Sequence, residues 1–118
     1  MRTTPIALTE QRLDDVTVTV ALSGELDYDT AGRIGPTLER LVEDRLVLGR
    51  PAGGREGELL LNMSGITFCD SSGVELLLRL QRRCAEAGAR LRLCQVPRRP
   101  GRVIRTLGVH RSVPCSFT

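Results

Sequence analysis

Residues 58–63, Glu58-Leu59-Leu60-Leu61-Asn62-Met63, form a short and nearly continuous apolar run. A run of this length is typical of a strand that is buried on both faces, in a sheet with parallel pairings. Parallel strands are joined by crossover connections, which are usually helices. The run therefore predicts the central strand of an α/β sheet.

A long amphipathic helix is predicted after this strand. Residues 64–69 are expected to cross to Asp70-Ser71-Ser72-Gly73, where the helix begins, and it runs to about Ala87. Gly88 is expected to end it in the left-handed conformation. Charged residues at offsets of zero, four, seven, eight and eleven form one solvated face: Glu75, Arg79, Arg82, Arg83 and Glu86. The residues left for the core are Leu76, Leu77, Leu80, Cys84 and Ala87.

A hairpin is predicted before the central strand. Residues 16–22 alternate β-branched apolar and polar side chains, the pattern of a strand with one face on a core. Residues 6–13 are expected to pair with it, because Asp14-Asp15 between the two segments supplies turn chemistry. Ser23-Gly24 interrupts the alternation, so the second strand is expected to end there and a polar stretch to follow.

A first helix and a loop are predicted between the hairpin and the central strand. The helix is expected from Ala31 to about Asp44, with Asp29 or Thr30 as its N-terminal cap. Its apolar stripe consists of Ile34, Leu38, Leu41 and Val42. Residues 49–57 contain four Gly and one Pro, which predicts a flexible surface insertion. A phosphate-binding loop of the Walker type would need a Lys, and the chain has none.

The C-terminal part continues the alternation of strands and helices. Residues 90–96 predict a strand that Pro97 ends, and residues 99–107 predict a short basic helix that Gly108 closes. Residues 109–117 are expected to return as an extended tail. The whole order predicts an α/β fold, in which about three to four helices cover a mixed sheet of four to five strands.

Size and composition limit the class of protein. The chain has 118 residues, of which 41% are hydrophobic and 26% charged, which predicts one domain over residues 1–118 with a core at about 6–117. No apolar run approaches the roughly 18 residues that cross a bilayer, and the N-terminus lacks the apolar segment of a secretory signal. A cytoplasmic protein without membrane contact is expected, with its four cysteines as reduced thiols.

The net charge of +3 is unevenly distributed along the chain. Residues 1–78 carry seven Arg and thirteen Asp or Glu, whereas residues 79–118 carry ten Arg and one Glu. A basic helix could bind nucleic acid through its arginines: Arg98, Arg99, Arg102 and Arg105. That helix has no aromatic side chain for stacking on bases, so no direct contact with nucleic acid is expected.

Catalytic and metal-binding chemistry have little support in the sequence. The chain has a single His, His110, in the turn before the last predicted strand, and no Gly-x-Ser-x-Gly elbow. One His and four scattered Cys give no pair at the spacing of metal ligands. Asp27 and Asp70 each follow a predicted strand, where a carboxylate commonly caps a helix. No enzyme activity, metal site or cofactor is therefore expected.

The segment Asp70-Ser71-Ser72-Gly73 is the most informative polar feature. It lies where a buried strand meets a helix, and the free N–H groups and the positive end of the helix dipole reach the surface there. A cap needs only one of the three polar side chains. At least one hydroxyl is then left facing solvent.

The segment 64–74, Ser64-Gly65-Ile66-Thr67-Phe68-Cys69-Asp70-Ser71-Ser72-Gly73-Val74, resembles the signature of the bacterial anti-sigma factor antagonists, which are small STAS domains. Two further segments resemble the family: residues 22–27, at the exit of its second strand, and residues 106–111, at the exit of its C-terminal helix. The chain departs from the family pattern at Asn62, where Asp is frequent, and in the insertion at residues 49–57.

This resemblance implies a partner switch. In the family, the serine after the aspartate, here Ser71, is phosphorylated by an anti-sigma factor that is itself a Ser/Thr kinase. The unphosphorylated antagonist binds this kinase and releases the sigma factor, and a Ser/Thr phosphatase restores it after phosphorylation. The resemblance makes Ser71 the expected phosphoacceptor, with Ser72 as the alternative. The expected partner-binding residues are Asp27, Asp70, Ser72, Gly73, Glu75 and Arg79.

The same residues are also compatible with a different function. The domain could be a STAS scaffold that is not phosphorylated, or a module that binds an anionic small molecule at the start of the helix after Asp70. Stabilisation by phosphate or a nucleotide in the absence of any kinase would favour the second of these.

Overall fold

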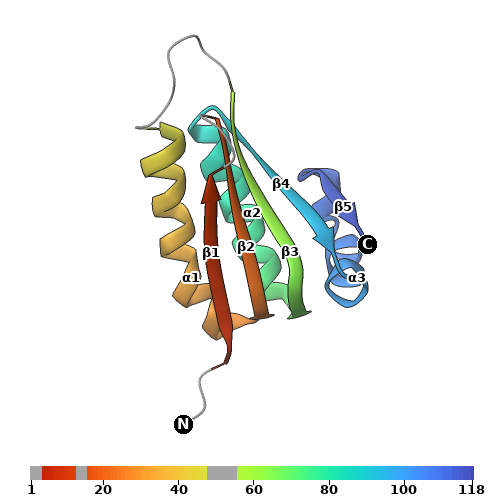
Figure 1. Cartoon of the computed structure of the whole chain (residues 1–118). Helices are drawn as coiled ribbons and strands as arrows, with labels where there is room; N and C mark the ends of the chain where they lie inside the picture. The colour runs from red at the N-terminus through yellow and green to blue at the C-terminus, as the bar shows by residue number, and fades with distance from the viewer. Residues whose placement is uncertain (1–3, 13–15, 48–55) are drawn as a thin grey trace.

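The computed structural model describes residues 4–12, 16–47 and 56–118. These residues form a five-stranded sheet in the order β1-β2-β3-β4-β5 (Figure 1). Only β1 and β2 are antiparallel, and every other neighbouring pair is parallel. The strands are β1 (Ile6–Arg12), β2 (Thr17–Leu26), β3 (Gly57–Cys69), β4 (Ala89–Val96) and β5 (Cys115–Phe117). The predicted hairpin, the mixed sheet and the central position of the 58–63 strand are confirmed.

An α-helix joins each pair of consecutive parallel strands. The helices are α1 (Tyr28–Leu41), α2 (Ser71–Glu86) and α3 (Arg98–Thr106), with a π-helical turn η1 (Val42–Val47) after α1 and a 3₁₀ turn η2 (Val109–Arg111) after α3. Such crossovers are right-handed, and the strand order advances in one direction across the sheet. Helices connected in this way gather on one face, and in Figure 1 the strands pass in front of α2.

The expectation that the central strand is buried on both faces is wrong. Along β3 the side chains of Leu59, Leu61 and Met63 are fully buried, whereas Leu60 and Asn62 between them are half-buried. β4 shows the same alternation, with Leu91 and Leu93 on the buried face. The reason is topological, because among the described residues the helices cover one face of this sheet and leave the other without a second layer.

Strands β2 and β3 both extend further than the sequence pattern indicates. β2 was expected to end at Ser23-Gly24, and residues 64–69 were expected to leave the sheet, but the two segments stay paired up to Leu26 and Cys69. Two register shifts absorb the irregular polar residues. Gly24 has a φ of +116°, and a Cβ there would lie 2.3 Å from the carbonyl oxygen of Pro5. Only glycine allows this close approach of β2 to the start of β1.

The ends of the first helix also differ from the prediction. α1 begins at Tyr28 with Asp27 as its cap, three residues before the expected start. Asp29 lies in the first turn, and Thr30 takes part in the cap from inside the helix. At the other end the helix continues as η1 to Val47, beyond the expected Asp44.

The exposed and buried faces of α2 largely follow the prediction. Its core residues Leu76, Leu77, Leu80 and Cys84 are buried. Arg83 differs, since it is half-buried and forms an ion pair with Glu43 of η1. Ala87, expected in the core, is half-buried because it lies at the end of the helix. Gly88 has the expected left-handed conformation, with a φ of +70°.

The C-terminal segment is not extended throughout. After Gly108, which has a φ of +76°, η2 forms and buries Val109, and only Cys115–Phe117 pairs with β4. Val113 is buried between η2 and β5, which anchors this connection to the core. The predicted turn at Asp14-Asp15 lies outside the described residues. So does the predicted insertion from residue 49 to 55, whereas Gly57 already belongs to β3.

All four cysteines are free thiols. Burial raises the pKa of Cys69 and of Cys84 to about 12, so both stay protonated at neutral pH and are poor nucleophiles. Within the described ranges, no helix combines the length and apolar character needed to cross a membrane.

Candidate functional site

The ends of β2 and β3 bring two aspartates to the same edge of the sheet. Leu26 and Cys69 are partners in the parallel pairing, and the next residue in each strand is an aspartate that caps a helix. The φ and ψ angles are −125° and −170° for Asp27, and −117° and −169° for Asp70. The backbone N–H of Asp70 donates to the carbonyl oxygen of Leu26 at 3.1 Å, which ties the two junctions together.

Asp27 belongs to a reciprocal cap with Thr30. Its Oδ1 accepts the backbone N–H of Thr30 at 2.9 Å, and the Thr30 hydroxyl oxygen accepts the backbone N–H of Asp27 at 2.9 Å. The Thr30 hydroxyl donates to the carbonyl oxygen of Glu25 at 2.7 Å, inside the core. The backbone N–H of Thr30 is the main cause that lowers the pKa of Asp27. The carboxylate is therefore charged at neutral pH and is held in place.

Asp70 leaves both neighbouring serines free. Its Oδ1 accepts the backbone N–H groups of Ser72 at 2.9 Å and of Gly73 at 3.3 Å, which satisfies the start of α2. Ser71 is exposed at the first position of the helix and Ser72 is half-buried. Among the described residues, neither serine hydroxyl has a hydrogen-bond partner. We call Asp27, Asp70, Ser71 and Ser72 the Ser71 site.

Gly73 allows α2 to start directly against the end of β2. A Cβ at this position would lie 2.8 Å from Sγ of Cys69, 2.9 Å from Cβ of Leu26 and 3.0 Å from the Leu26 carbonyl oxygen. The Cβ and the carbonyl oxygen of Leu26 cannot move without shifting β2. Gly73, predicted as a partner-binding residue, is buried, so its role in the structure is to position the serines before it.

Gly73→Ala is expected to destabilise the fold by about 1–3 kcal/mol, because the added methyl group has no space. Gly32→Ala is the matched control, since Gly32 also lies in a helix and has nothing within 4 Å of the position of its Cβ. That change should stabilise the protein by about 0.5–1 kcal/mol. Urea denaturation measures both values. Equal effects of the two substitutions would contradict the close contact at Gly73.

A groove between α1 and α2 adjoins the Ser71 site. Its volume is about 440 Å³. The residues that line it are Ser72, Glu75 and Arg79 of α2, with Tyr28, Asp29, Ala31, Gly32 and Arg33 of α1. Arg79 pairs with Glu39 of α1 at 3.2 Å, so its charge is partly neutralised across the groove. Three of the predicted partner-binding residues, Ser72, Glu75 and Arg79, therefore lie together on one surface.

The sequence profile of the STAS domain matches residues 7–118. The chain belongs to the STAS domain family. Comparison with curated protein sequences finds no match. Among solved structures, this STAS domain resembles an anti-sigma factor antagonist from Mycobacterium paratuberculosis, with 20% identity, a TM-score of 0.74, and coverage of 95% of this chain and 86% of the other.

Two structures of SpoIIAA share the same fold. The anti-sigma factor antagonist SpoIIAA in its unphosphorylated form has 21% identity and a TM-score of 0.72, covering 93% of this chain and 88% of the other. The phosphorylated form of SpoIIAA, a Bacillus cell fate determinant, has 21% identity and a TM-score of 0.64, covering 93% and 91%. The resemblance found in the sequence and the predicted STAS-like fold are both confirmed.

Two aromatic residues beside the Ser71 site of this STAS domain were missed in the sequence. Tyr28 is 84% exposed at the first position of α1, and Phe68 is 45% exposed near the end of β3. The signal was present, since each aromatic residue lies one or two positions from a capping aspartate in a chain with only three aromatics. Aromatic side chains are enriched on surfaces that bind another protein.

The Ser71 site is suited to presenting a hydroxyl. Ser71 is exposed beside the junction that the Asp27 and Asp70 caps share. The only His of the chain, His110, belongs to a different element, η2. Among the described residues, no group of three or more His, Cys, Asp or Glu is arranged to hold a metal ion. The first turn of α2 offers its positive dipole end to an added negative group.

Proposed function

We propose that this STAS domain is an anti-sigma factor antagonist that is switched off by phosphorylation of Ser71. In the unphosphorylated state it binds an anti-sigma factor with Ser/Thr kinase activity, which then releases its sigma factor. The observation that carries the proposal is the exposed Ser71 hydroxyl, which has no described hydrogen-bond partner and is displayed by the Asp70 cap. The family membership and the fold shared with two anti-sigma factor antagonists support it.

Ser71 is favoured over Ser72 as the phosphoacceptor because of exposure. A kinase must place the hydroxyl in line with a nucleotide phosphate, which requires access from several directions. Ser71 is exposed, whereas Ser72 is half-buried and turned toward the groove between α1 and α2. The difference in exposure therefore supports Ser71 as the phosphoacceptor, in addition to its place directly after Asp70 in the sequence.

The fold should tolerate a phosphate on Ser71. Negative charge at the first turn of a helix interacts favourably with the helix dipole, by about 0.3–1 kcal/mol at exposed sites. The nearby Asp27 and Asp70 carboxylates oppose this gain. The net effect on folding is expected to be small, so the added charge should act mainly on the surface that a partner covers.

The proposed partner-binding surface surrounds Ser71. It combines the capping carboxylates, the groove residues Glu75 and Arg79, and the exposed rings of Tyr28 and Phe68. Exposed aromatic rings can supply apolar contact area, and the charged residues at the rim can set orientation. A Ser/Thr phosphatase would act on the same face to remove the phosphate. Such a switch would operate in the cytoplasm of a bacterium, where sigma factors act.

Phosphate mapping tests the proposal directly. The protein is incubated with ATP and a Ser/Thr kinase anti-sigma factor from the same organism, and the modified residue is identified by mass spectrometry. We expect one phosphate, on Ser71, that is lost in Ser71→Ala and retained in Ser72→Ala. A phosphate on Ser72 in the unmodified protein would contradict the acceptor assignment, and no phosphate on either serine would contradict the switch.

A further inference from the structure

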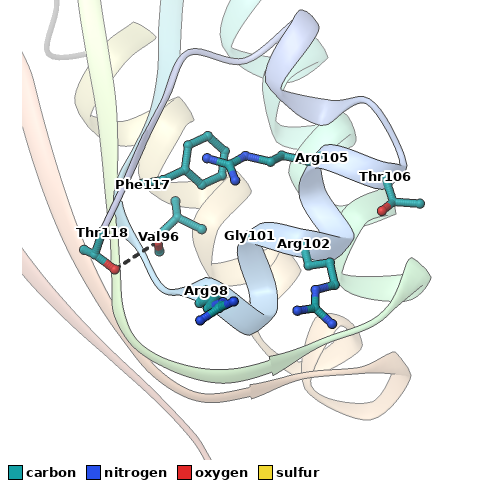
Figure 2. Close-up of a pocket in the computed structure, with 8 residues that line it drawn as sticks. All are labelled: Val96, Arg98, Gly101, Arg102, Arg105, Thr106, Phe117 and Thr118. Atoms are coloured by element: carbon teal, nitrogen blue, oxygen red, sulfur yellow. Dashed lines mark hydrogen bonds between the residues drawn. The ribbon is translucent and has the colours of Figure 1, made fainter.

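A basic cavity lies between α3 and β5, at the edge of the sheet opposite β1 (Figure 2). Its volume is about 310 Å³. This is the lower end of the range for small-molecule sites in proteins, about 300–1,000 Å³. Arg98, Arg102 and Arg105 of α3 line it together with Phe117 of β5. We call it the α3–β5 cavity.

The three arginines lie on one face of α3. Their offsets of zero, four and seven residues place them on successive turns of the same face. Gly101 lies between them, and a Cβ there would lie 3.0 Å from Cδ1 of Phe117. The missing side chain lets the helix approach the ring. The guanidinium carbon of Arg105 lies 3.9 Å from the centre of the ring, in cation–π contact.

The wall that Phe117 forms is fixed by the sheet. Phe117 is paired with Val96 of β4, and the next residue, Thr118, donates twice to the carbonyl oxygen of Val96. Its backbone N–H donates at 3.0 Å and its hydroxyl at 3.3 Å (Figure 2). The ring, and the arginine stacked on it, are therefore held in position before any ligand binds.

None of the three arginines of the cavity forms an ion pair within the described residues. Elsewhere in the described residues five arginines form ion pairs: Arg33, Arg45, Arg79, Arg83 and Arg92. Within those same ranges no carboxylate pairs with Arg98, Arg102 or Arg105. Like charges four residues apart repel, and Arg98 lies at the positive end of a helix whose cap, Pro97, gives no side-chain hydrogen bond. A bound anion would relieve this repulsion.

We propose that the α3–β5 cavity binds a small molecule through its phosphate or diphosphate group. Guanidinium groups bind phosphate oxygens with two parallel hydrogen bonds, and three arginines line a space of suitable size. Arg105 already covers the Phe117 ring, so this face of the ring is not free to stack on a ligand. The cavity is therefore expected to recognise the anionic group of the ligand. This site is separate from the Ser71 site, and it does not depend on the function proposed for Ser71.

The shape of the cavity favours a compact anion over nucleic acid. A nucleic-acid backbone needs a basic surface that extends over several phosphates. Arg99, the remaining arginine of α3, lies outside this cavity and borders a second hollow beside Phe68, which Arg102 also lines. The cavity itself encloses a small volume, which suits a compact anion better than an extended chain of phosphates, and the test below separates the two by comparing Arg99 with Arg102.

Calorimetric titration of the full chain with inorganic pyrophosphate tests the proposal. We expect binding with a Kd below about 1 mM, and about tenfold weaker binding for Arg102→Gln and for Arg105→Gln. Arg82→Gln is the matched control, because Arg82 is an exposed arginine of α2 without a described ion pair and its loss changes the net charge equally. Ser71→Ala should bind pyrophosphate as the unmodified protein does.

Three results would overturn the proposal. The first is no binding of pyrophosphate by protein that circular dichroism shows to be folded. The second is an equal loss of affinity in Arg82→Gln and Arg102→Gln, which would indicate attraction by net charge alone. The third is tighter binding of a short single-stranded oligonucleotide that weakens equally in Arg99→Gln and Arg102→Gln, which would make α3 a nucleic-acid surface.

Discussion

Ser71→Glu is expected to weaken binding of the anti-sigma factor kinase at least about a hundredfold. The substitution places a permanent negative charge on an exposed position that the proposed interface covers, beside the carboxylates of Asp27 and Asp70. A charge that is buried in an interface without a partner costs about 2–5 kcal/mol, and about 2.7 kcal/mol corresponds to a hundredfold change in Kd. Surface plasmon resonance with the purified kinase measures the effect.

Two control variants separate this effect from general changes in charge or stability. Ser71→Ala should keep the affinity of the unmodified protein, because the hydroxyl has no described partner to lose. Ala85→Glu adds the same charge to an exposed position about 21 Å further along α2, and it should have little effect on binding. Similar affinities for Ser71→Ala and Ser71→Glu would argue against a phosphorylation switch at this residue. Ser71→Glu should unfold at the same urea concentration as the unmodified protein.

Leu61→Ala is expected to destabilise the fold by about 3–4 kcal/mol, the effect of a cavity at the centre of the core. The Leu61 side chain is 0% exposed, and its partners on the neighbouring strands, Val20 and Leu93, are equally buried. Neighbours in a sheet cannot move together to fill the space. The free energy of unfolding in urea measures the loss.

Leu60→Ala is the matched substitution on the same strand. Leu60 is half-buried on the face without helices, where its partners are Thr19 and Arg92. We expect a loss of about 1 kcal/mol or less. A loss equal to that of Leu61→Ala would mean that a second layer covers this face in solution, and the description of the sheet as covered on one face would then be wrong.

The faces of the helices could be predicted from the sequence, whereas the burial of the central strand could not. The spacing of Leu76, Leu77, Leu80 and Cys84 records which side of α2 meets the core, because each helix has its own apolar period. An apolar run such as 58–63 does not record whether both sides are covered. That depends on the direction in which the strand order advances, which only the complete topology determines.

The ends of the strands were missed for a related reason. Residues 23–26 and 64–69 look irregular in sequence, and they remain in the sheet because each is the pairing partner of the other. That pairing also determines which residue caps α1. Asp27, Asp29 and Thr30 all carry suitable side-chain oxygens, but only Asp27 directly follows the last paired residue, Leu26.

The polar groups of the candidate site could be predicted from the sequence, but the exposed surface around them could not. Asp70-Ser71-Ser72-Gly73 has the composition of a strand-to-helix junction, and its resemblance to a family signature indicated Ser71. Which oxygen makes the cap depends on backbone geometry, and this is what leaves Ser71 free. The exposure of Tyr28 depends on what packs around it, which the local sequence pattern does not encode.

The length of β3 separates two ends of the molecule that can be engineered independently. Its 13 residues span about 40 Å, from Gly57, where the connection through residues 48–55 enters, to Cys69, directly before the Asp70 cap. A fluorescent label attached at the exposed Glu56, directly before β3, would lie far from Ser71. It would allow kinase binding to be followed in real time without blocking the surface that the kinase must reach.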